Sequence, residues 1–281
     1  MEEQFSMVNK ALQKDAMRVL KETSRTFYIP ITFLKKDLKT AVANAYLIMR
    51  ALDEIEDNES EQVTIDIKHA ILMEVSELLK AEEFDNERYL ALLEPYKQFM
   101  PEVTLRMKDW IDLVPTGAKK IVNDAASEMA FGMAKWAKAN WQVHTREDLD
   151  EYTYYVAGLV GVMLSDLWEW DSGVKTDREL AIGYGRGLQA VNILRNREED
   201  METRGVSFVP DGWTQKELFE YTEENLEKAY KYMEDINKRS ILLFCRLPLA
   251  LAHRTLKAIQ EGREKMSRIE VEQIAQEIQE N

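Results

Sequence analysis

Apolar residues recur at helical intervals over most of the chain. Ile67, Ile71, Val75 and Leu78 follow one another at three- and four-residue steps, a spacing typical of a helix that buries one face. Residues 117–141 repeat the pattern. Turn-forming combinations separate such segments at residues 24–30, 56–60, 92–102, 112–117, 170–177 and 207–213. With no strand-like alternation, the pattern predicts an all-α protein of roughly ten helices.

Two segments, residues 39–52 and 154–168, are apolar on every side of a helix. Such helices occupy the middle of a bundle rather than its surface. The sequence shows no internal repeat and no linker rich in Gly or Ser, so we expect a single domain spanning residues 1–281.

A carboxylate cluster follows the first of these apolar segments. Asp53 and Asp57 are four residues apart, and Arg50 precedes them on nearly the same face of a helix. In an acidic chain this pair could be an ordinary solvated face. Carboxylates inside a bundle, however, must be paired, protonated or bound to cations.

A second polar stripe runs along residues 185–205. Gln189, Asn192, Asn196 and Asp200 are spaced by three, four and four residues, which places them on one helical face. Oxygen ligands without His or Cys suit a hard cation, Mg²⁺ in particular, which commonly shares phosphate oxygens with a substrate. Two such helices would provide a metal-bridged diphosphate site in a bundle.

Composition narrows the function further. A net charge of −14 disfavours nucleic acid as a partner. The single cysteine, Cys245, excludes an internal disulfide and is expected to be a buried, inert thiol. His69, His144 and His253 lack metal-ligand spacing and are expected to be structural or exposed. The acidic N-terminal residues do not form a signal peptide, and no apolar run reaches the roughly 18–20 residues of a membrane span. These features predict a cytoplasmic protein.

Five segments, in order, resemble the squalene/phytoene synthase family, and its squalene synthase branch more than its phytoene branch. They are TSRTF from Thr23, LIMRALDEIEDN from Leu47, YTYYVAGLVGVMLS from Tyr152, LQAVNILRNREED from Leu188 and LLFCRLPLALA from Leu242. The resemblance implies diphosphate contacts by Ser24, Arg25, Arg50, Gln189 and Arg204, metal binding by Asp53, Asp57, Asn192, Asn196 and Asp200, and proton handling by Tyr155.

The family's chemistry implies a helical bundle of isoprenoid synthase type around a central apolar cavity. The implied reaction is Mg²⁺-dependent, with about two or three ions, and joins two farnesyl diphosphates head to head. The implied product is presqualene diphosphate, followed by squalene or dehydrosqualene. NADPH is a candidate reductant, for which the cations of REKMSR (Arg263–Arg268) are a candidate site, and the apolar product suggests peripheral membrane contact. Residues expected to line the prenyl cavity are Phe27, Met129, Met133, Ala157, Gly158, Gly161 and Phe244, although ordinary core packing would also explain them.

The chain departs from the family pattern at two places. Asn196 stands where an aspartate is usual, and TRGVSFVP (Thr203–Pro210) lacks the second arginine of the usual Arg-Gly-Arg run. The Asn192-xxx-Asn196-xxx-Asp200 spacing is similar to the Asn-xxx-Ser-xxx-Glu metal triad of class I terpene cyclases, which has a neutral middle ligand. Two alternatives therefore stay open. One is an enzyme acting on a single prenyl diphosphate, as a cyclase, a diphosphate hydrolase or a transferase to a non-isoprenoid acceptor. The other is a non-catalytic lipid-binding or interaction module.

Overall fold

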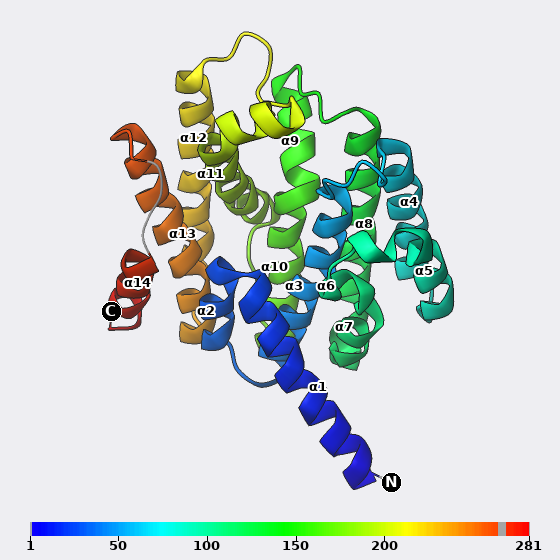
Figure 1. Cartoon of the computed structure of the whole chain (residues 1–281). Coiled ribbons are helices and arrows are strands. Elements are labelled where there is room, and N and C mark those ends of the chain that lie inside the picture. The colour runs from blue at the N-terminus through cyan, green and yellow to red at the C-terminus, as the bar shows by residue number, and fades with distance from the viewer. Residues whose placement is uncertain (1, 264–267, 281) are drawn as a thin grey trace. The chain divides into compact units, whose positions relative to one another are not determined.

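The computed structural model describes residues 2–263 and 268–280, with the side chains of residues 2–8, 25 and 268 outside that description. In the described residues the regular structure is helical, with fourteen α-helices and two shorter helical segments and no strand (Figure 1). The predicted all-α class is confirmed. None of the described helices combines the length and apolar character needed to cross a bilayer.

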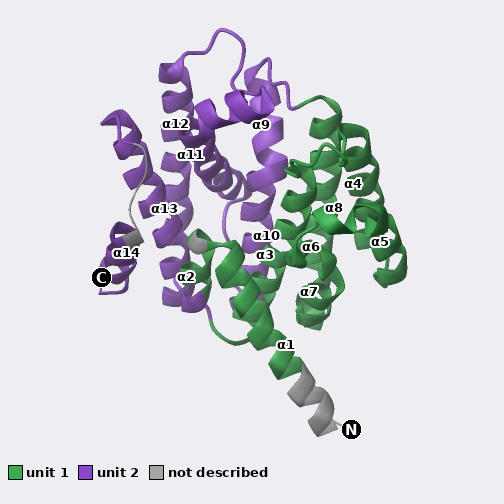
Figure 2. Cartoon of the chain, in the orientation of Figure 1, with its two compact units in different colours: residues 1–31, 35–140 green, residues 32–34, 141–281 purple. Residues whose placement is uncertain are grey.

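The chain divides into two compact units (Figure 2). The N-terminal unit comprises residues 1–31 and 35–140, and the C-terminal unit comprises residues 32–34 and 141–281. The single-domain interpretation of residues 1–281 stays a prediction. The helices of the N-terminal unit are α1 (Glu2–Thr23), α2 (Arg25–Phe33) up to residue 31, α3 (Lys36–Glu56), α4 (Ile65–Lys80), α5 (Asn86–Leu93), the 3₁₀ segment η1 (Glu94–Phe99), α6 (Glu102–Leu105), α7 (Met107–Leu113) and α8 (Thr116–Lys138).

The helix α3 is the centre of the N-terminal unit. It contacts α1, α4, α6, α7 and α8, and consecutive residues such as Ala43, Asn44 and Ala45 are all buried. The prediction that residues 39–52 form a buried central helix is therefore confirmed. The Thr104 hydroxyl in α6 donates a hydrogen bond to the Ala51 carbonyl of α3 at 3.2 Å. The buried hydroxyl therefore has a hydrogen-bond partner.

The pair α4 and α8 packs closely through two serines. The Ser76 hydroxyl donates to the Ser127 carbonyl at 2.9 Å, and the Ser127 hydroxyl donates back to the Ser76 carbonyl at 2.8 Å. Small side chains that satisfy one another let the two helices approach without leaving a buried polar group unpaired.

The helices of the C-terminal unit are α9 (Arg146–Thr153), the π-helical turn η2 (Tyr154–Gly158), α10 (Leu159–Ser172), α11 (Arg178–Arg204), α12 (Gln215–Glu234), α13 (Arg239–Gln260) and α14 (Arg268–Glu280). Within this unit α11 is the central helix, in contact with α9, η2, α10, α12 and α13. Each of the two polar motifs found in the sequence thus lies on the central helix of its own unit.

Glycines bring α11 against η2 and α10. A Cβ placed on Gly185 would lie 2.2 Å from the Ala157 carbonyl oxygen, and one on Gly161 would lie 2.2 Å from the Ala181 carbonyl oxygen. Both positions therefore need glycine because a backbone atom occupies the space of a side chain.

We expect Gly185→Ala to destabilise the protein by about 1–3 kcal/mol, because the added methyl group meets backbone that cannot rotate away. Urea unfolding followed by circular dichroism measures this cost. Gly183→Ala is the matched comparison, because its added Cβ meets the Lys228 side chain rather than backbone, and its cost should be smaller. Equal midpoints for wild type and Gly185→Ala would contradict the packing described.

Two parts of the helix pattern differ from the sequence prediction. Residues 24–30 read as a turn, but Arg25–Phe33 is a helix with Pro30 inside it. Residues 92–102 also read as a turn, yet η1 and the start of α6 lie there. Short helices of this kind raise the number of elements above the roughly ten predicted, because segments of four to nine residues are too short for periodicity to define.

Candidate active site

The acidic motif lies at the C-terminal end of α3. Arg50 and Asp53 are in the helix, and Asp57 is its C-cap, with its backbone N–H donating to the Asp53 carbonyl at 2.8 Å. Asp53 is half-buried and Asp57 is exposed. The two carboxylates are close enough to interact electrostatically, and their role as a metal-binding pair stays a prediction.

Burial and the Asp57 carboxylate raise the pKa of Asp53 to about 7, with Glu54 adding to the effect and the Arg50 guanidinium opposing it. A nearby cation would relieve this cost by favouring the ionised form. Arg50 pairs with Glu54, and its Nε is buried without a hydrogen-bond partner among the described residues. A buried N–H donor without a partner is suited to bind an anionic ligand. The Asp53 and Asp57 carboxylates are suited to bind a hard cation.

The stability of the metal-free protein should depend on Asp53. Folding raises the pKa of Asp53 from 3.8 to about 7. Between about pH 4 and pH 7 the Asp53 carboxyl therefore keeps its proton in the folded state and loses it in the unfolded state. Asp53 therefore stabilises the fold least above about pH 7, and its contribution falls as pH rises through this window. We expect Asp53→Asn to raise the melting temperature of the metal-free protein at pH 8 by about 3 °C or more.

Thermal melts in EDTA at pH 5 and pH 8 measure this effect. The gain for Asp53→Asn should shrink at pH 5, where the wild-type carboxyl is already mostly protonated in the folded state. Added Mg²⁺ at pH 8 should stabilise the wild type more than the variant, because a ligand that binds the native state stabilises it. A gain that is equal at both pH values would contradict the assigned pKa.

The structure places Ser24 and Phe27 beside the same face of α3. The Phe27 amide donates to the Ser24 hydroxyl oxygen at 3.0 Å, and the Phe27 and Tyr46 ring centroids are 5.8 Å apart. Ser24 also forms a hydrogen bond with the Tyr46 hydroxyl, and burial raises the Tyr46 pKa. The sequence interpretation missed Tyr46, although its position one turn before Arg50 indicates the shared face. The side chain of Arg25 lies outside the described residues.

The predicted amide and carboxylate stripe lies on α11. Gln189, Asn192, Asn196 and Asp200 are all half-buried, between buried apolar residues and exposed charges. The Asn196 carbonyl oxygen accepts from Arg195 Nε at 3.2 Å. Over the described residues no three His, Cys, Asp or Glu side chains form a group able to hold a metal ion. The amide oxygens, which are also capable ligands, make up most of this stripe.

Tyr155 lies on the π turn η2, with its ring centroid 5.6 Å from that of Tyr154. Arg204 ends α11, and its guanidinium lies 4.6 Å from the Trp141 ring centroid and 5.6 Å from that of Phe208. Both aromatic residues have positive φ values, 51° and 52°, which are unusual for bulky side chains. The sequence interpretation did not identify this aromatic support of Arg204.

The residues predicted to line a prenyl cavity lie in both units. Met129 and Met133 are buried in α8, and Phe244 of α13 is buried edge-on against Trp168 with centroids 5.4 Å apart. Ala157 is half-buried on η2. Gly161 and Gly158 face α11 at Ala181 and Ile182, so their missing side chains make room for a helix. A prenyl-lining role for these residues stays a prediction.

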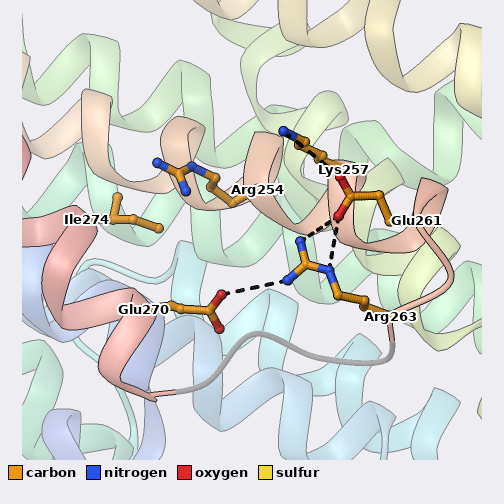
Figure 3. Close-up of a pocket in the computed structure, with 6 residues that line it drawn as sticks. All are labelled: Arg254, Lys257, Glu261, Arg263, Glu270 and Ile274. Carbon is orange, nitrogen blue, oxygen red and sulfur yellow. Dashed lines mark hydrogen bonds and ion pairs between the residues drawn. The ribbon is translucent and has the colours of Figure 1, made fainter.

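A small surface pocket lies between α13 and α14. It is lined by Arg254, Lys257, Glu261, Arg263, Glu270 and Ile274 (Figure 3). Arg263 is paired with Glu261 at 2.7 Å and lies 3.8 Å from Glu270. Of the predicted cofactor segment Arg263–Arg268, residues 264–267 and the side chain of Arg268 lie outside the described part of the chain.

The expectations for cysteine and histidine hold. Cys245 is buried, and burial raises its pKa far above neutrality, so the thiol is inert. His69 contacts the Ala134 carbonyl, and His144 pairs with Asp211 at 3.0 Å in an exposed position. Burial lowers the pKa of His253.

Known proteins match this chain along most of its length. Residues 20–220 match the family described as squalene/phytoene synthase. Squalene synthase of Rattus norvegicus is 30% identical over 275 residues, covering 87% of this chain and 63% of the relative. Squalene synthase 10 of Panax ginseng is 31% identical over 270 residues, covering 85% of this chain and 61% of the relative. The chain thus spans about three fifths of the length of these relatives.

Solved structures show the same fold. A complex of TcSQS with the ligand E5700 superposes with a TM-score of 0.77 at 21% identity, covering 94% of this chain and 85% of that one. A dehydrosqualene synthase in complex with a ligand superposes with a TM-score of 0.60 at 21% identity, covering 98% of this chain and 97% of that one. The residues that match the family model, 20–220, include both polar motifs. The chain therefore belongs to the squalene/phytoene synthase family.

Proposed function

We propose that this protein is a Mg²⁺-dependent prenyltransferase. It would condense two farnesyl diphosphates head to head to presqualene diphosphate and then form squalene or dehydrosqualene. Family membership supports the reaction class. The observation that carries the proposal is the pair of neighbouring carboxylates at the end of α3, Asp53 and Asp57. Beside them Arg50 has a buried Nε without a hydrogen-bond partner in the described part of the chain, so carboxylates suited to a hard cation stand next to a donor suited to an anion.

In this proposal Asp53 and Asp57 of α3, with Asn192, Asn196 and Asp200 of α11, hold Mg²⁺. When bound, Mg²⁺ would supply positive charge against the negative charge that grows on a departing diphosphate. Arg50 binds the diphosphate through its buried Nε, and Ser24, Arg25, Gln189 and Arg204 are the further contacts we propose.

The apolar side chains proposed for the cavity would exclude water from the carbocation left after diphosphate departure. Met133 and Phe244 offer polarisable surfaces, and an aromatic face attracts a cation. Tyr155, half-buried on the π turn, is the proposed proton carrier. NADPH would be the reductant if squalene is the final product.

Purified protein incubated with farnesyl diphosphate and Mg²⁺, with and without NADPH, tests this proposal by product mass. Presqualene diphosphate or a triterpene hydrocarbon is the expected product. Squalene only when NADPH is present would add the reductive step. An absence of pyrophosphate release under all conditions would overturn the proposal and favour a non-catalytic lipid-binding or interaction module.

A second candidate function uses one prenyl diphosphate only. The neutral Asn196 in the stripe and the missing second arginine of the Thr203–Pro210 run favour it, because a second diphosphate would then be offered a weaker metal ligand and one cationic side chain fewer. The same incubation separates the two candidates. Farnesol or a sesquiterpene hydrocarbon without triterpene products would support the single-substrate enzyme.

A further inference from the structure

The helix that carries Tyr155 is interrupted by one wide turn. In η2 the Leu159 amide donates to the Tyr154 carbonyl, five residues back, where an α-helix would bond four residues back. Such a turn inserts one residue and rotates the following face of the helix by about 100°. Single π turns inside α-helices are frequent at functional sites.

A side chain of the central helix α11 forms hydrogen bonds at the beginning of this turn. Arg186 Nη2 donates to the Asp150 backbone carbonyl at 2.8 Å, and Arg186 Nε donates to the same oxygen at 3.3 Å. This carbonyl also accepts the Tyr154 amide, where α9 passes into η2. The Arg186 side chain is only 20% exposed, so most of it is withdrawn from solvent at this contact.

The Asp150 side chain also has partners on α11 and α12. Asp150 Oδ1 lies 3.8 Å from Arg186 Nε and accepts the Tyr221 hydroxyl of α12 at 2.7 Å. The Tyr221 hydroxyl is also 3.2 Å from the Thr153 hydroxyl in the last residue of α9. Two helices therefore hold the residues that lead into the wide turn.

The end of the turn packs against Gly185 of α11, the residue before Arg186. Gly185 lies so close to Ala157 that a Cβ on it would be 2.2 Å from the Ala157 carbonyl oxygen. Consecutive residues of α11 thus hold both ends of η2, one by hydrogen bonds and one by backbone contact. A regular α-helical turn in this place would break one of these two arrangements.

We propose that Arg186 is a positioning residue for Tyr155, which rests on the role given to Tyr155 under the proposed function. Arg186 donates hydrogen bonds to the Asp150 carbonyl and so stabilises the π-helical turn η2. This turn then fixes the orientation of the Tyr155 side chain. Arg186 acts on the reaction through Tyr155 and is not proposed to touch the substrate.

Four variants test the inference through kinetics. Arg186→Met should lower kcat for farnesyl diphosphate by about tenfold to a hundredfold, with KM within about twofold because substrate contacts are untouched. Arg186→Lys, which keeps a charged donor, should recover most of the loss. Arg186→Met in a Tyr155→Phe background should cause little further loss, because both changes remove the same effect. Arg178→Met, an exposed arginine earlier on α11, is the matched control and should behave as wild type.

Hydrogen exchange measured by mass spectrometry tests the turn without substrate. Amides of residues 154–159 should exchange faster in Arg186→Met than in wild type, with α13 unchanged. If Arg186→Met does not fold, Arg186→Gln, which keeps a neutral donor, takes its place in both measurements and should give a smaller change in the same direction. Unchanged exchange, or losses in kcat that multiply in the double variant, would overturn the inference.

If the wild type turns over no prenyl diphosphate, the proposed function fails. Hydrogen exchange alone then still decides whether Arg186 stabilises the turn.

Discussion

Asp53→Asn is expected to lower Mg²⁺-dependent release of pyrophosphate from farnesyl diphosphate by on the order of a thousandfold. The amide has nearly the shape of the carboxyl group but carries no charge, so the α3 motif loses half of its carboxylate pair. A metal ion held by one carboxylate fewer neutralises less of the charge that develops on the leaving group. A coupled pyrophosphate assay at several Mg²⁺ concentrations measures the loss.

Glu83→Gln is the matched control for this change. It removes one carboxylate from an exposed position in the same unit, so the change in net charge is the same and activity should stay within about twofold of wild type. Together with the pH-dependent melting described above, a loss of activity in a more stable protein would separate a metal role from a folding defect. Activity retained by Asp53→Asn would contradict the assignment of the α3 motif.

Asp200→Asn is expected to have the second largest effect, a loss of on the order of a hundredfold or more in pyrophosphate release. Asp200 is the one carboxylate of the α11 stripe, and Gln189, Asn192 and Asn196 are neutral amides. Removing it leaves only weak ligands for Mg²⁺ on that helix. Adding Asn196→Asp to this variant should restore part of the activity, because a carboxylate returns to the same face one turn earlier.

Glu202→Gln controls for charge on the same helix. Glu202 is exposed and lies two residues beyond Asp200, so it does not share the face of the stripe. Asn196→Asp alone should lower the Mg²⁺ concentration needed for half-maximal rate, since affinity rises with the number of charged ligands. Equal losses in Glu202→Gln and Asp200→Asn would show a general charge effect and remove the basis for the stripe.

The central helices could be predicted because their signal is long and periodic. The run from Lys39 to Leu52 has enough apolar residues to require burial on all sides, and α3 is buried in that way. The prediction missed α2 because Pro30 suggests a turn, whereas the helix accommodates it at its sixth residue. The π turn could not be predicted, since a shift of one residue in backbone hydrogen bonding leaves no mark in composition or spacing.

The candidate site was predictable only within each helix. Spacings of three, four and seven residues place Arg50, Asp53 and Asp57 on one face, and the structure agrees. Contacts between helices depend on packing, which the sequence does not encode locally. The hydrogen bond from Ser24 to Tyr46 and the support of Arg204 by Trp141 are of this kind. The close approach of the α11 backbone to Gly161 of α10 is another such contact, which spacing along the chain does not reveal.

The proposed function requires that oxygens of both polar motifs bind the same metal–diphosphate group. Mn²⁺ titrated into the protein with inorganic pyrophosphate, followed by electron paramagnetic resonance, tests it most directly. We expect pyrophosphate to strengthen Mn²⁺ binding to the wild type, and Asp53→Asn and Asp200→Asn each to weaken it by on the order of tenfold or more. Wild-type Mn²⁺ binding in either variant, or binding that pyrophosphate does not change, would contradict the claim.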